Sequence, residues 1–211
     1  MYVGRRMTRN VITVSPEDTL ARAAALMKEH RVHHLPVVAG EELAGIVTDT
    51  DVRNFTLGLT STDRGGGIDV RDTKVGEIMT REPVTVGPWD TVEDALLILH
   101  RRRFGALPVV EGRRLVGIIS KTDVLAAFID TLCVEGIGVR IEVLVPRDAN
   151  AVVRLVKTVG ELEVEMKSLV LSPFRDGFVA FLRLSTIDVA TVREKLRKAG
   201  FQIPELSDFL G

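Results

Sequence analysis

The chain carries the stretch LPVVAGEELAGIVTDTDV at residues 35–52 and repeats it in altered form, LPVVEGRRLVGIISKTDV, at residues 107–124. The likeness extends upstream, because residues 7–52 align with residues 79–124 without a gap. Ungapped self-similarity over this length indicates that one structural unit has been duplicated. The first part of the chain therefore predicts two copies of one small fold.

Within one copy, the apolar pattern predicts a strand, a helix, two strands and a second helix. Residues 11–14 predict a short strand, and residues 15–18 offer an N-cap with proline at the first helical position, so we expect a helix to begin there. Residues 35–38 and 43–47 predict a hairpin, with a helix from Asp49 or Thr50. One copy cannot cover both faces of its sheet, so the two copies are expected to pack together.

The leading strand, the LPVV strand and the GIVTDTD segment before a helix, found in both copies, resemble the CBS domain. The resemblance implies an α+β fold with tandem CBS repeats, a Bateman module: repeat 1 at residues 1–60, a linker at 61–74 and repeat 2 at 75–132. The linker contains Gly65, Gly66 and Gly67. We interpret it as a flexible connection, since the strand, Lys-Ser/Thr and helix context of a phosphate loop is missing.

A hydroxyl and a carboxylate stand at the start of the second predicted helix in each copy, as Thr48 with Asp51 and as Ser120 with Asp123. A helix N-terminus presents unpaired N–H groups, and residues three apart in its first turn can face one ligand. The CBS resemblance implies that these four residues contact the ribose of an adenosine ligand. The alternative is a capping box, in which the same side chains only satisfy the helix N-terminus.

The CBS resemblance also implies where the adenine ring would lie, between the leading strand and the strand after the first helix. The expected walls are Thr13, Val14, Val37 and Val38 in one cleft, and Thr85, Val86, Val109 and Val110 in the other. For any single valine, ordinary core packing is the competing interpretation.

The phosphate groups of a nucleotide require cations near the cleft mouth. The candidates are His33 and His34, which the resemblance favours, together with Arg103 and Lys121. A bound phosphate would raise the pKa of a neighbouring histidine, so affinity would weaken as the pH rises. A solvated helix end for Arg103 and a surface position for the histidines are the alternatives. Two adjacent histidines alone do not predict a metal site, and none is expected.

The last third of the chain, residues 138–211, has a different pattern. Residues 139–145 alternate like a half-buried strand, and residues 149–162 predict a helix with an apolar face at Val152, Val153, Val156 and Val159. Residues 163–171 and 177–184 predict a strand pair, followed by a helix at 189–199 and a short strand at 201–203. The predicted order is βαββαβ.

That order matches the ferredoxin-like plan and resembles the ACT domain, a module that often senses small molecules. Asn150 stands where ligand-binding ACT domains commonly have a glycine. Asparagine can adopt the left-handed conformation, but its side chain occupies space that glycine leaves open. A structural or dimerising role is therefore preferred to amino-acid sensing. Over nearly its whole length, the chain resembles the acetoin-utilisation AcuB-type family, which implies a regulatory role.

Composition argues against several classes of protein. The formal net charge is −1, so the cationic field of a nucleic-acid binder is missing. A single cysteine, Cys133, favours a reducing, cytoplasmic setting. No apolar run is long enough to span a membrane, so membrane insertion is not expected.

These features predict a non-catalytic regulatory protein that needs no cofactor and binds AMP, ADP, ATP or an NAD-like adenosine compound in the clefts between paired repeats. A homodimer is expected, with a regulated protein partner of unknown identity. The alternatives are an oligomerisation scaffold with vacant clefts and a nucleotide-processing enzyme that uses Asp51, His33 or His34. The enzyme is disfavoured because the sequence offers no Cys–His arrangement, metal-ligand cluster or paired acid and base at helical spacing.

Overall fold

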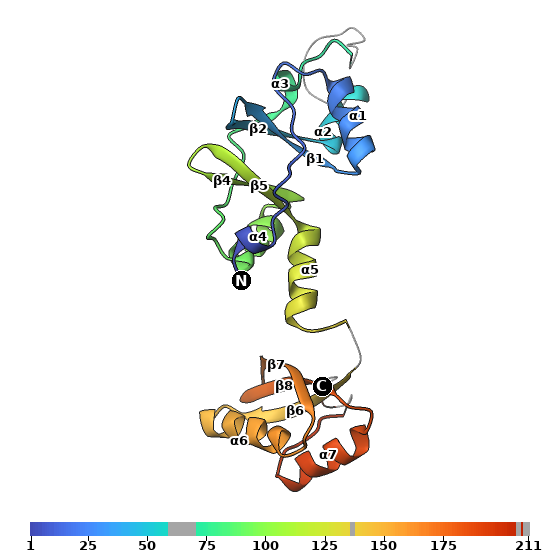
Figure 1. Ribbon diagram of the computed structural model, residues 1–211. Coiled ribbons are helices and arrows are strands. Elements are labelled where there is room, and N and C mark those ends of the chain that lie inside the picture. The colour runs from blue at the N-terminus through green and yellow to red at the C-terminus, as the bar shows by residue number, and fades with distance from the viewer. Residues whose placement is uncertain (59–70, 136–137, 206–207, 209–211) are drawn as a thin grey trace. The chain divides into compact units, whose positions relative to one another are not determined.

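Figure 1 shows the chain as a computed structural model, which describes residues 1–58, 71–135, 138–205 and 208. The chain divides into two compact units, Met1–Ala127 and Phe128–Gly211. Most of the predicted linker at 61–74, including Gly65, Gly66 and Gly67, lies outside the described residues.

Two hairpins with the same register make the sheet of the first unit. β1 (His34–Ala39) pairs with β2 (Glu42–Thr48), and β4 (Ala106–Glu111) pairs with β5 (Arg114–Ser120), antiparallel in both cases. The order β1-β2-β5-β4 joins the hairpins through a single pairing of Glu42 with Arg114. Both predicted hairpins are confirmed, as expected of β-branched runs separated by short turns.

The helices of the two repeats begin at equivalent residues. α1 (Leu20–His30) and α4 (Val92–Arg101) follow Thr19 and Thr91, whose hydroxyls accept backbone N–H groups of the first turn. The predicted start at residues 15–18 is wrong, because the Asp18 carboxylate accepts the Ser15 N–H at 2.7 Å and holds these residues in a turn. α2 (Asp49–Thr56) and α5 (Lys121–Thr131) follow the hairpins directly, as predicted.

The segment that precedes each repeat crosses to the other repeat. The 3-10 helix η1 (Val3–Arg5) lies on the second repeat, where the Gly4 N–H donates to the Pro88 carbonyl at 2.8 Å. Its counterpart α3 (Val75–Ile78) lies on the first repeat, where the Gly76 N–H donates to the Pro16 carbonyl at 2.9 Å. After α3, β3 (Thr80–Arg81) pairs with β2. The exchanged segments interlock the two repeats.

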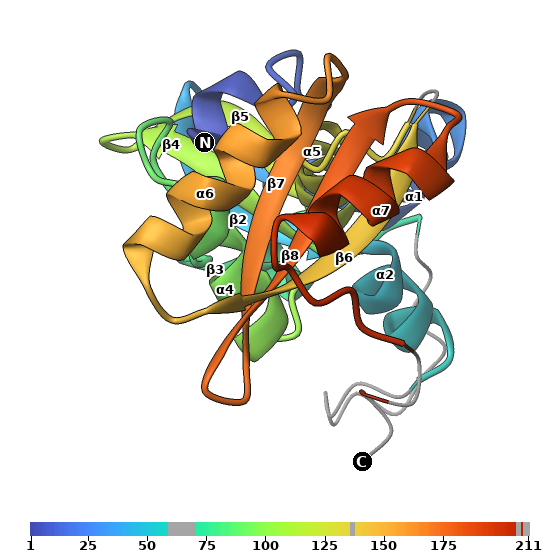
Figure 2. The same cartoon turned by 90° about the horizontal axis from the view of Figure 1, so that it is seen from below.

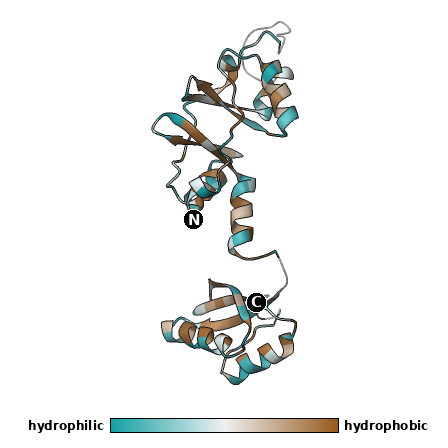
Figure 3. Ribbon diagram, in the orientation of Figure 1, coloured by the Kyte–Doolittle hydropathy of each residue, from teal (hydrophilic) through white to brown (hydrophobic). Residues whose placement is uncertain are grey.

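Residues 11–14 do not form the predicted strand. Val14 makes one isolated parallel bridge to Val37, and Val86 makes the equivalent bridge to Val109. These four valines are almost completely buried. Val14 and Val37 belong to the core of the first repeat, which also receives Val75 from the exchanged segment. Figure 3 shows apolar residues concentrated on the strands, with polar residues towards the hairpin tips.

The second unit is an antiparallel sheet with two helices on one face (Figure 2). Its elements are β6 (Val139–Pro146), α6 (Ala149–Gly160), β7 (Glu165–Phe174), β8 (Gly177–Ser185) and α7 (Val189–Lys198), and the sheet order is β6-β8-β7. The predicted last strand at 201–203 is reduced to one antiparallel bridge between Gln202 and Leu144. The predicted order of elements is otherwise confirmed.

The face of α6 that packs on the sheet agrees only in part with the predicted one, since Val159 and Val152 belong to it but Val153 and Val156 do not. Ala151, Leu155 and Val159 are buried, whereas Val153 and Val156 are 51% and 39% exposed. The run of valines is apolar around much of the helix, so its pattern does not single out the buried side. Asn150 lies in the first turn of α6, where its N–H donates to the Asp148 carboxylate, and it does not adopt the left-handed conformation.

Among the helices in the described ranges, none combines the length and apolar character needed to cross a membrane.

Candidate ligand-binding clefts

Two clefts open on the first unit, each where the helix start of one repeat faces the leading segment of the other. Cleft 1 has a volume of about 460 Å³ and brings Thr48 and Asp51 of the first repeat against Pro83 and Val84. Its other lining residues are His34, Ile46, Asp49, Thr50, Thr80, Glu82, Arg103, Phe104, Gly105, Ala106 and Pro108.

Cleft 2 is built from the equivalent parts with the repeats exchanged. It has a volume of about 390 Å³ and brings Ser120 and Asp123 of the second repeat against Val11 and Ile12. Its other lining residues are Thr8, Asn10, Arg31, Val32, His33, His34, Gly105, Ala106, Ile118 and Thr122. Both clefts therefore depend on the crossing of the leading segments.

A capping box holds the carboxylate at the start of each helix. The N–H and the hydroxyl of Thr48 donate to Asp51 Oδ2 at 2.8 and 2.7 Å, and the Asp51 N–H donates back to the hydroxyl at 3.2 Å. Ser120 and Asp123 make the same three bonds at 2.8, 2.7 and 3.2 Å. These side chains therefore do form the capping boxes of the alternative interpretation, but capping does not use both carboxylate oxygens. Within the described residues, Oδ1 of each aspartate has no hydrogen-bond partner and is left to accept one.

His34 lies between the clefts and lines both of them. Its ring packs against Gly105, where an added Cβ would collide with the imidazole. Burial lowers the pKa of His34 below the ordinary imidazole value, and the Asp49 carboxylate opposes this shift. His33 is far more exposed, with Nδ1 at 3.4 Å from Asp49.

The first residues of α2 and α5 are equivalent in the two repeats but carry opposite charges. Asp49 and Lys121 occupy the same place, because their backbone N–H groups donate to the carbonyls of His33 and Gly105, each at 3.0 Å. Asp49 lines cleft 1 and also pairs with Arg53 at 2.7 Å. Lys121 follows Ser120, which lines cleft 2, but is not itself one of the lining residues.

The other charged residues increase this difference. The carboxylates that line cleft 1 are Asp49, Asp51 and Glu82, and the opposing cation is Arg103. In cleft 2, Asp123 is the lining carboxylate, with Arg31 as the lining guanidinium and His33 beside it. Cleft 2 is therefore the more favourable environment for an anion.

None of the eight residues predicted as adenine walls lines either cleft. Val14, Val37, Val86 and Val109 are core residues, and the competing interpretation of core packing is correct for them. Thr13, Val38, Thr85 and Val110 are only partly buried but also lie outside the two linings. The residues that face the clefts come earlier in each leading segment. The repeat alignment contained this signal, because it pairs Val11 and Ile12 with Pro83 and Val84.

The predicted phosphate residues are divided between the clefts. His33 lines cleft 2, Arg103 lines cleft 1 and His34 lines both. Arg31, the counterpart of Arg103 and a candidate cation of the first repeat, also lines cleft 2. Both arginines adopt positive φ angles of 54° and 57° at the ends of α1 and α4.

In the part of the chain that the structure describes, no group of three or more His, Cys, Asp or Glu side chains could hold a metal ion.

The first unit is a module of two interlocked repeats with two equivalent clefts. The family model of the CBS domain matches residues 3–58 and 75–130, which together are more than half of the chain. The chain therefore belongs to the CBS-domain family.

Two curated relatives match the paired repeats at similar length. The inosine-5'-monophosphate dehydrogenase of Korarchaeum cryptofilum is 43% identical over 117 residues, which make up 55% of this chain and 22% of the enzyme. CBS domain-containing protein YhcV of Bacillus subtilis is 38% identical over 117 residues, 56% of this chain and 78% of YhcV. The chain thus spans only about a fifth of the dehydrogenase but most of YhcV.

Solved structures extend the similarity to ligand complexes. CBSX2 in complex with AMP is 30% identical with a TM-score of 0.52, covering 61% of this chain and 96% of that chain. The CBS domain pair of MJ0100 in complex with 5'-methylthioadenosine and S-adenosyl-L-methionine is 25% identical with a TM-score of 0.53, covering 61% and 99%. An AcuB protein of Vibrio cholerae is 28% identical with a TM-score of 0.54, covering 64% and 94%. The predicted CBS pair is confirmed, and the ACT type of the second unit stays a prediction.

Proposed function

We propose that the chain is a non-catalytic regulatory protein that binds an adenosine-type ligand in clefts 1 and 2. The observation that carries this proposal is the pair of cleft-lining carboxylates, Asp51 and Asp123, each fixed by a capping box with one oxygen left to accept hydrogen bonds. The complexes of CBSX2 with AMP and of MJ0100 with 5'-methylthioadenosine and S-adenosyl-L-methionine support an adenosine ligand.

In the proposed mode, the free oxygen of each aspartate accepts hydrogen bonds from the ribose hydroxyls. The Thr48 and Ser120 hydroxyls are already engaged as donor and acceptor within the capping boxes, so the carboxylates contribute most of the ribose interaction. The adenine ring packs against Pro83 and Val84 in cleft 1 and against their counterparts in cleft 2, because apolar walls with few polar groups suit a planar base.

The different charges of the two clefts support different ligands for them. We place phosphate groups in cleft 2, where Arg31 and His33 line the wall and where Lys121, although not a lining residue, directly follows Ser120 in the chain. Cleft 1, with Asp49 and Glu82, repels a phosphate and accepts an adenosine compound without one. His34 lines both clefts, so an anion in either cleft would favour its protonated form.

A ligand in either cleft would touch both repeats at once. It therefore stabilises the paired arrangement relative to any state in which the repeats have shifted, by as much as its affinities for the two states differ. This differential binding is the proposed regulatory signal, and it would be read by a partner protein or by the second unit.

The proposed assembly is a homodimer, with the second unit of ACT type contributing to self-association. Exposed leucines on α4 and α5 support this, since Leu97 is 46% and Leu125 is 60% exposed. Apolar side chains that gather on helix surfaces commonly mark protein interfaces.

Calorimetric titration of the full chain with AMP, ADP, ATP, NAD and S-adenosylmethionine tests the proposal. Asp51→Asn and Asp123→Asn keep an oxygen for the capping box but place an amide donor where the ribose needs an acceptor. Each variant is expected to lose binding in its own cleft by about tenfold to hundredfold, the effect of hydrogen bonds to a charged group.

Asp94→Asn is the matched control. Asp94 accepts the Thr91 hydroxyl at 2.6 Å at the start of α4 but lies outside both clefts, so this variant should bind like the parent. No binding of any nucleotide at millimolar concentration would replace the proposal with the vacant scaffold. Binding that is unchanged by both cleft substitutions would show that the ligand binds outside these clefts, which contradicts the proposed mode. Turnover of the bound nucleotide, followed by chromatography and abolished in the same variants, would replace it with the enzyme.

A further inference from the structure

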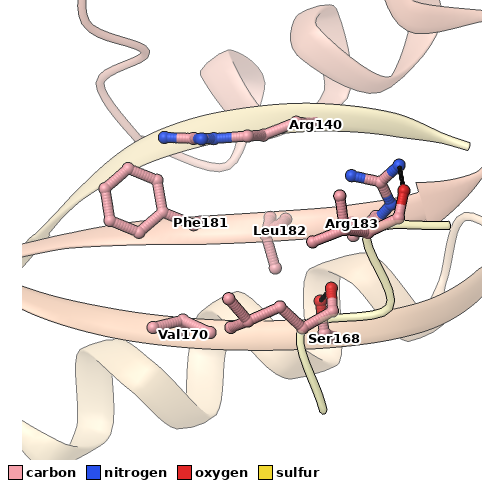
Figure 4. Close-up of a pocket in the computed structure, with 8 residues that line it drawn as sticks. Arg140, Ser168, Val170, Phe181, Leu182 and Arg183 are labelled. Carbon is pink, nitrogen blue, oxygen red and sulfur yellow. Dashed lines mark hydrogen bonds between the residues drawn. The ribbon is translucent and has the colours of Figure 1, made fainter. Parts of the chain in front are cut away.

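The second unit contains a pocket that the proposed function does not use. The pocket has a volume of about 290 Å³ and lies on the sheet face opposite α6 and α7, under the segment that follows α5 (Figure 4). Phe181 and Val170 are neighbours across β8 and β7 and supply its apolar floor. Leu132 and Val134 of the overlying segment also line it.

Two arginines stand side by side in this pocket. Arg140 of β6 and Arg183 of β8 are directly paired in the antiparallel register. Like charges in directly opposite positions destabilise a sheet unless an opposite charge compensates them. Arg140 has such compensation, since it pairs with Glu142 at 2.7 Å and lies over the Phe181 ring at 4.4 Å.

Arg183 is not compensated in this way. Its Nη2 donates to the Val134 carbonyl at 2.6 Å, an interaction visible in Figure 4. Its Nε is buried and has no hydrogen-bond partner, and no carboxylate within the described ranges pairs with this guanidinium. A buried donor without an acceptor is destabilising, and more so when the group is charged, so the position of Nε suits an acceptor supplied by a ligand.

We infer that this pocket binds a small apolar carboxylate, with the acid on Arg183 and the hydrocarbon part against Phe181 and Val170. The volume suits about ten non-hydrogen atoms, at the lower end of known ligand pockets. The lining contains no carboxylate that could receive an ammonium group. The site should therefore prefer a simple carboxylic acid to the amino acid of the same side chain.

Titration of the full chain with phenylacetate and with 4-methylpentanoate, followed by calorimetry, is the direct test. Phenylacetamide removes the charge and phenylalanine adds the ammonium group, so both should bind at least about tenfold more weakly than phenylacetate. Arg183→Met should remove phenylacetate binding. Val170→Phe should also remove it by filling the pocket while leaving both arginines in place.

Arg147→Met is the matched control, because Arg147 also lies over a phenylalanine, Phe178 at 5.8 Å, but outside this pocket. It should bind phenylacetate like the parent. Circular dichroism checks that the variants fold, and AMP binding reports on the first unit separately. The inference is overturned if folded parent protein does not bind either acid at millimolar concentration, if the amide binds equally well, or if binding survives both pocket variants. It is also overturned if sedimentation shows that the pocket variants abolish a dimer, since a second copy would then be the occupant.

Discussion

Clefts 1 and 2 are made from equivalent residues, yet Asp49 lines cleft 1, whereas its counterpart Lys121 follows a lining residue of cleft 2 and carries the opposite charge. The hydrogen bonds of the two capping boxes have the same lengths, and the crossing segments use the same backbone hydrogen bonds. The duplicated features are those that build the repeat. The features that differ lie on the surface of the clefts, where a change of charge alters binding but leaves the capping box and the hairpin intact.

The crossing itself differs between the repeats in how tightly the segments pack. Gly45 of β2 faces β3, and a Cβ added there would lie 2.7 Å from Met79 Sδ and 2.8 Å from the Thr80 carbonyl oxygen. At the equivalent Gly117, a Cβ would meet Met7 Sδ at 2.5 Å and the Thr8 carbonyl oxygen at 3.1 Å. The flexible methionine can move in both cases, but the close backbone oxygen beside Gly45 cannot move cheaply.

The largest expected effect follows from this contrast. Gly45→Ala should lower the free energy of unfolding by about 2–3 kcal/mol and Gly117→Ala by about 1 kcal/mol, the range for overpacked sites. Amide hydrogen exchange of peptides from the first unit, followed by mass spectrometry in increasing urea, reports on the stability of this unit. Gly87→Ala is the control, since its Cβ would meet nothing closer than 3.8 Å. Equal losses at the two equivalent glycines would contradict the asymmetry.

The local parts of the repeat were predictable from the sequence, whereas the crossing was not. The hairpins follow from short β-branched runs around a turn, and the aspartates at the helix starts follow from their spacing. Residues 11–14 also have a strand-like sequence, but Val14 forms only one bridge, because the chain enters from the other repeat. A contact between residues of different repeats leaves no local sequence pattern. The predicted adenine walls therefore fell on residues outside the clefts, four of which are buried valines.

In the second unit, the sequence likewise did not fully predict which side of α6 is buried. Its valines make the helix apolar on more than one side, and the buried side is set by Ala151 and Leu155, which fit against the sheet. The first strand, the strand pair and both helices were predictable because their patterns are regular. The pocket was not, because Arg140 and Arg183 become neighbours only through the register of β6 with β8.

A smaller effect is expected when the charges of the clefts are exchanged. Lys121→Asp should weaken AMP binding in cleft 2 by about tenfold, and Asp49→Lys should strengthen it in cleft 1 by a similar factor. Binding of uncharged 5'-methylthioadenosine should change much less in either variant. Calorimetry at low and high salt provides the measurement, because screening should shrink the AMP effect. Arg154→Asp, at an exposed site on α6, makes the same change in net charge as Lys121→Asp and should leave both affinities unaltered.

The smallest expected effect concerns His34, which both clefts share. Because burial lowers the pKa of His34 below its ordinary value of 6.5, the native protein binds fewer protons than the unfolded chain in this range. Keeping the His34 ring neutral therefore contributes fully to the free energy of unfolding above pH 6.5. This contribution is lost as the pH falls towards the pKa that His34 has in the folded protein. Asp49 and Asp51 oppose the shift in pKa, whereas His33 and Lys121 add to it.

A bound phosphate acts in the opposite direction, because it raises the pKa of His34 and couples binding to proton uptake. As the pH falls from neutral, the free protein should become less stable while its affinity for AMP rises by about twofold to fivefold. His34→Gln should remove both dependences, and His100→Gln, exposed on α4 outside the clefts, should remove neither. Calorimetry in buffers of different ionisation enthalpy measures the uptake directly. If AMP binding takes up no protons in the parent, the ligand does not reach the imidazole that separates the two clefts.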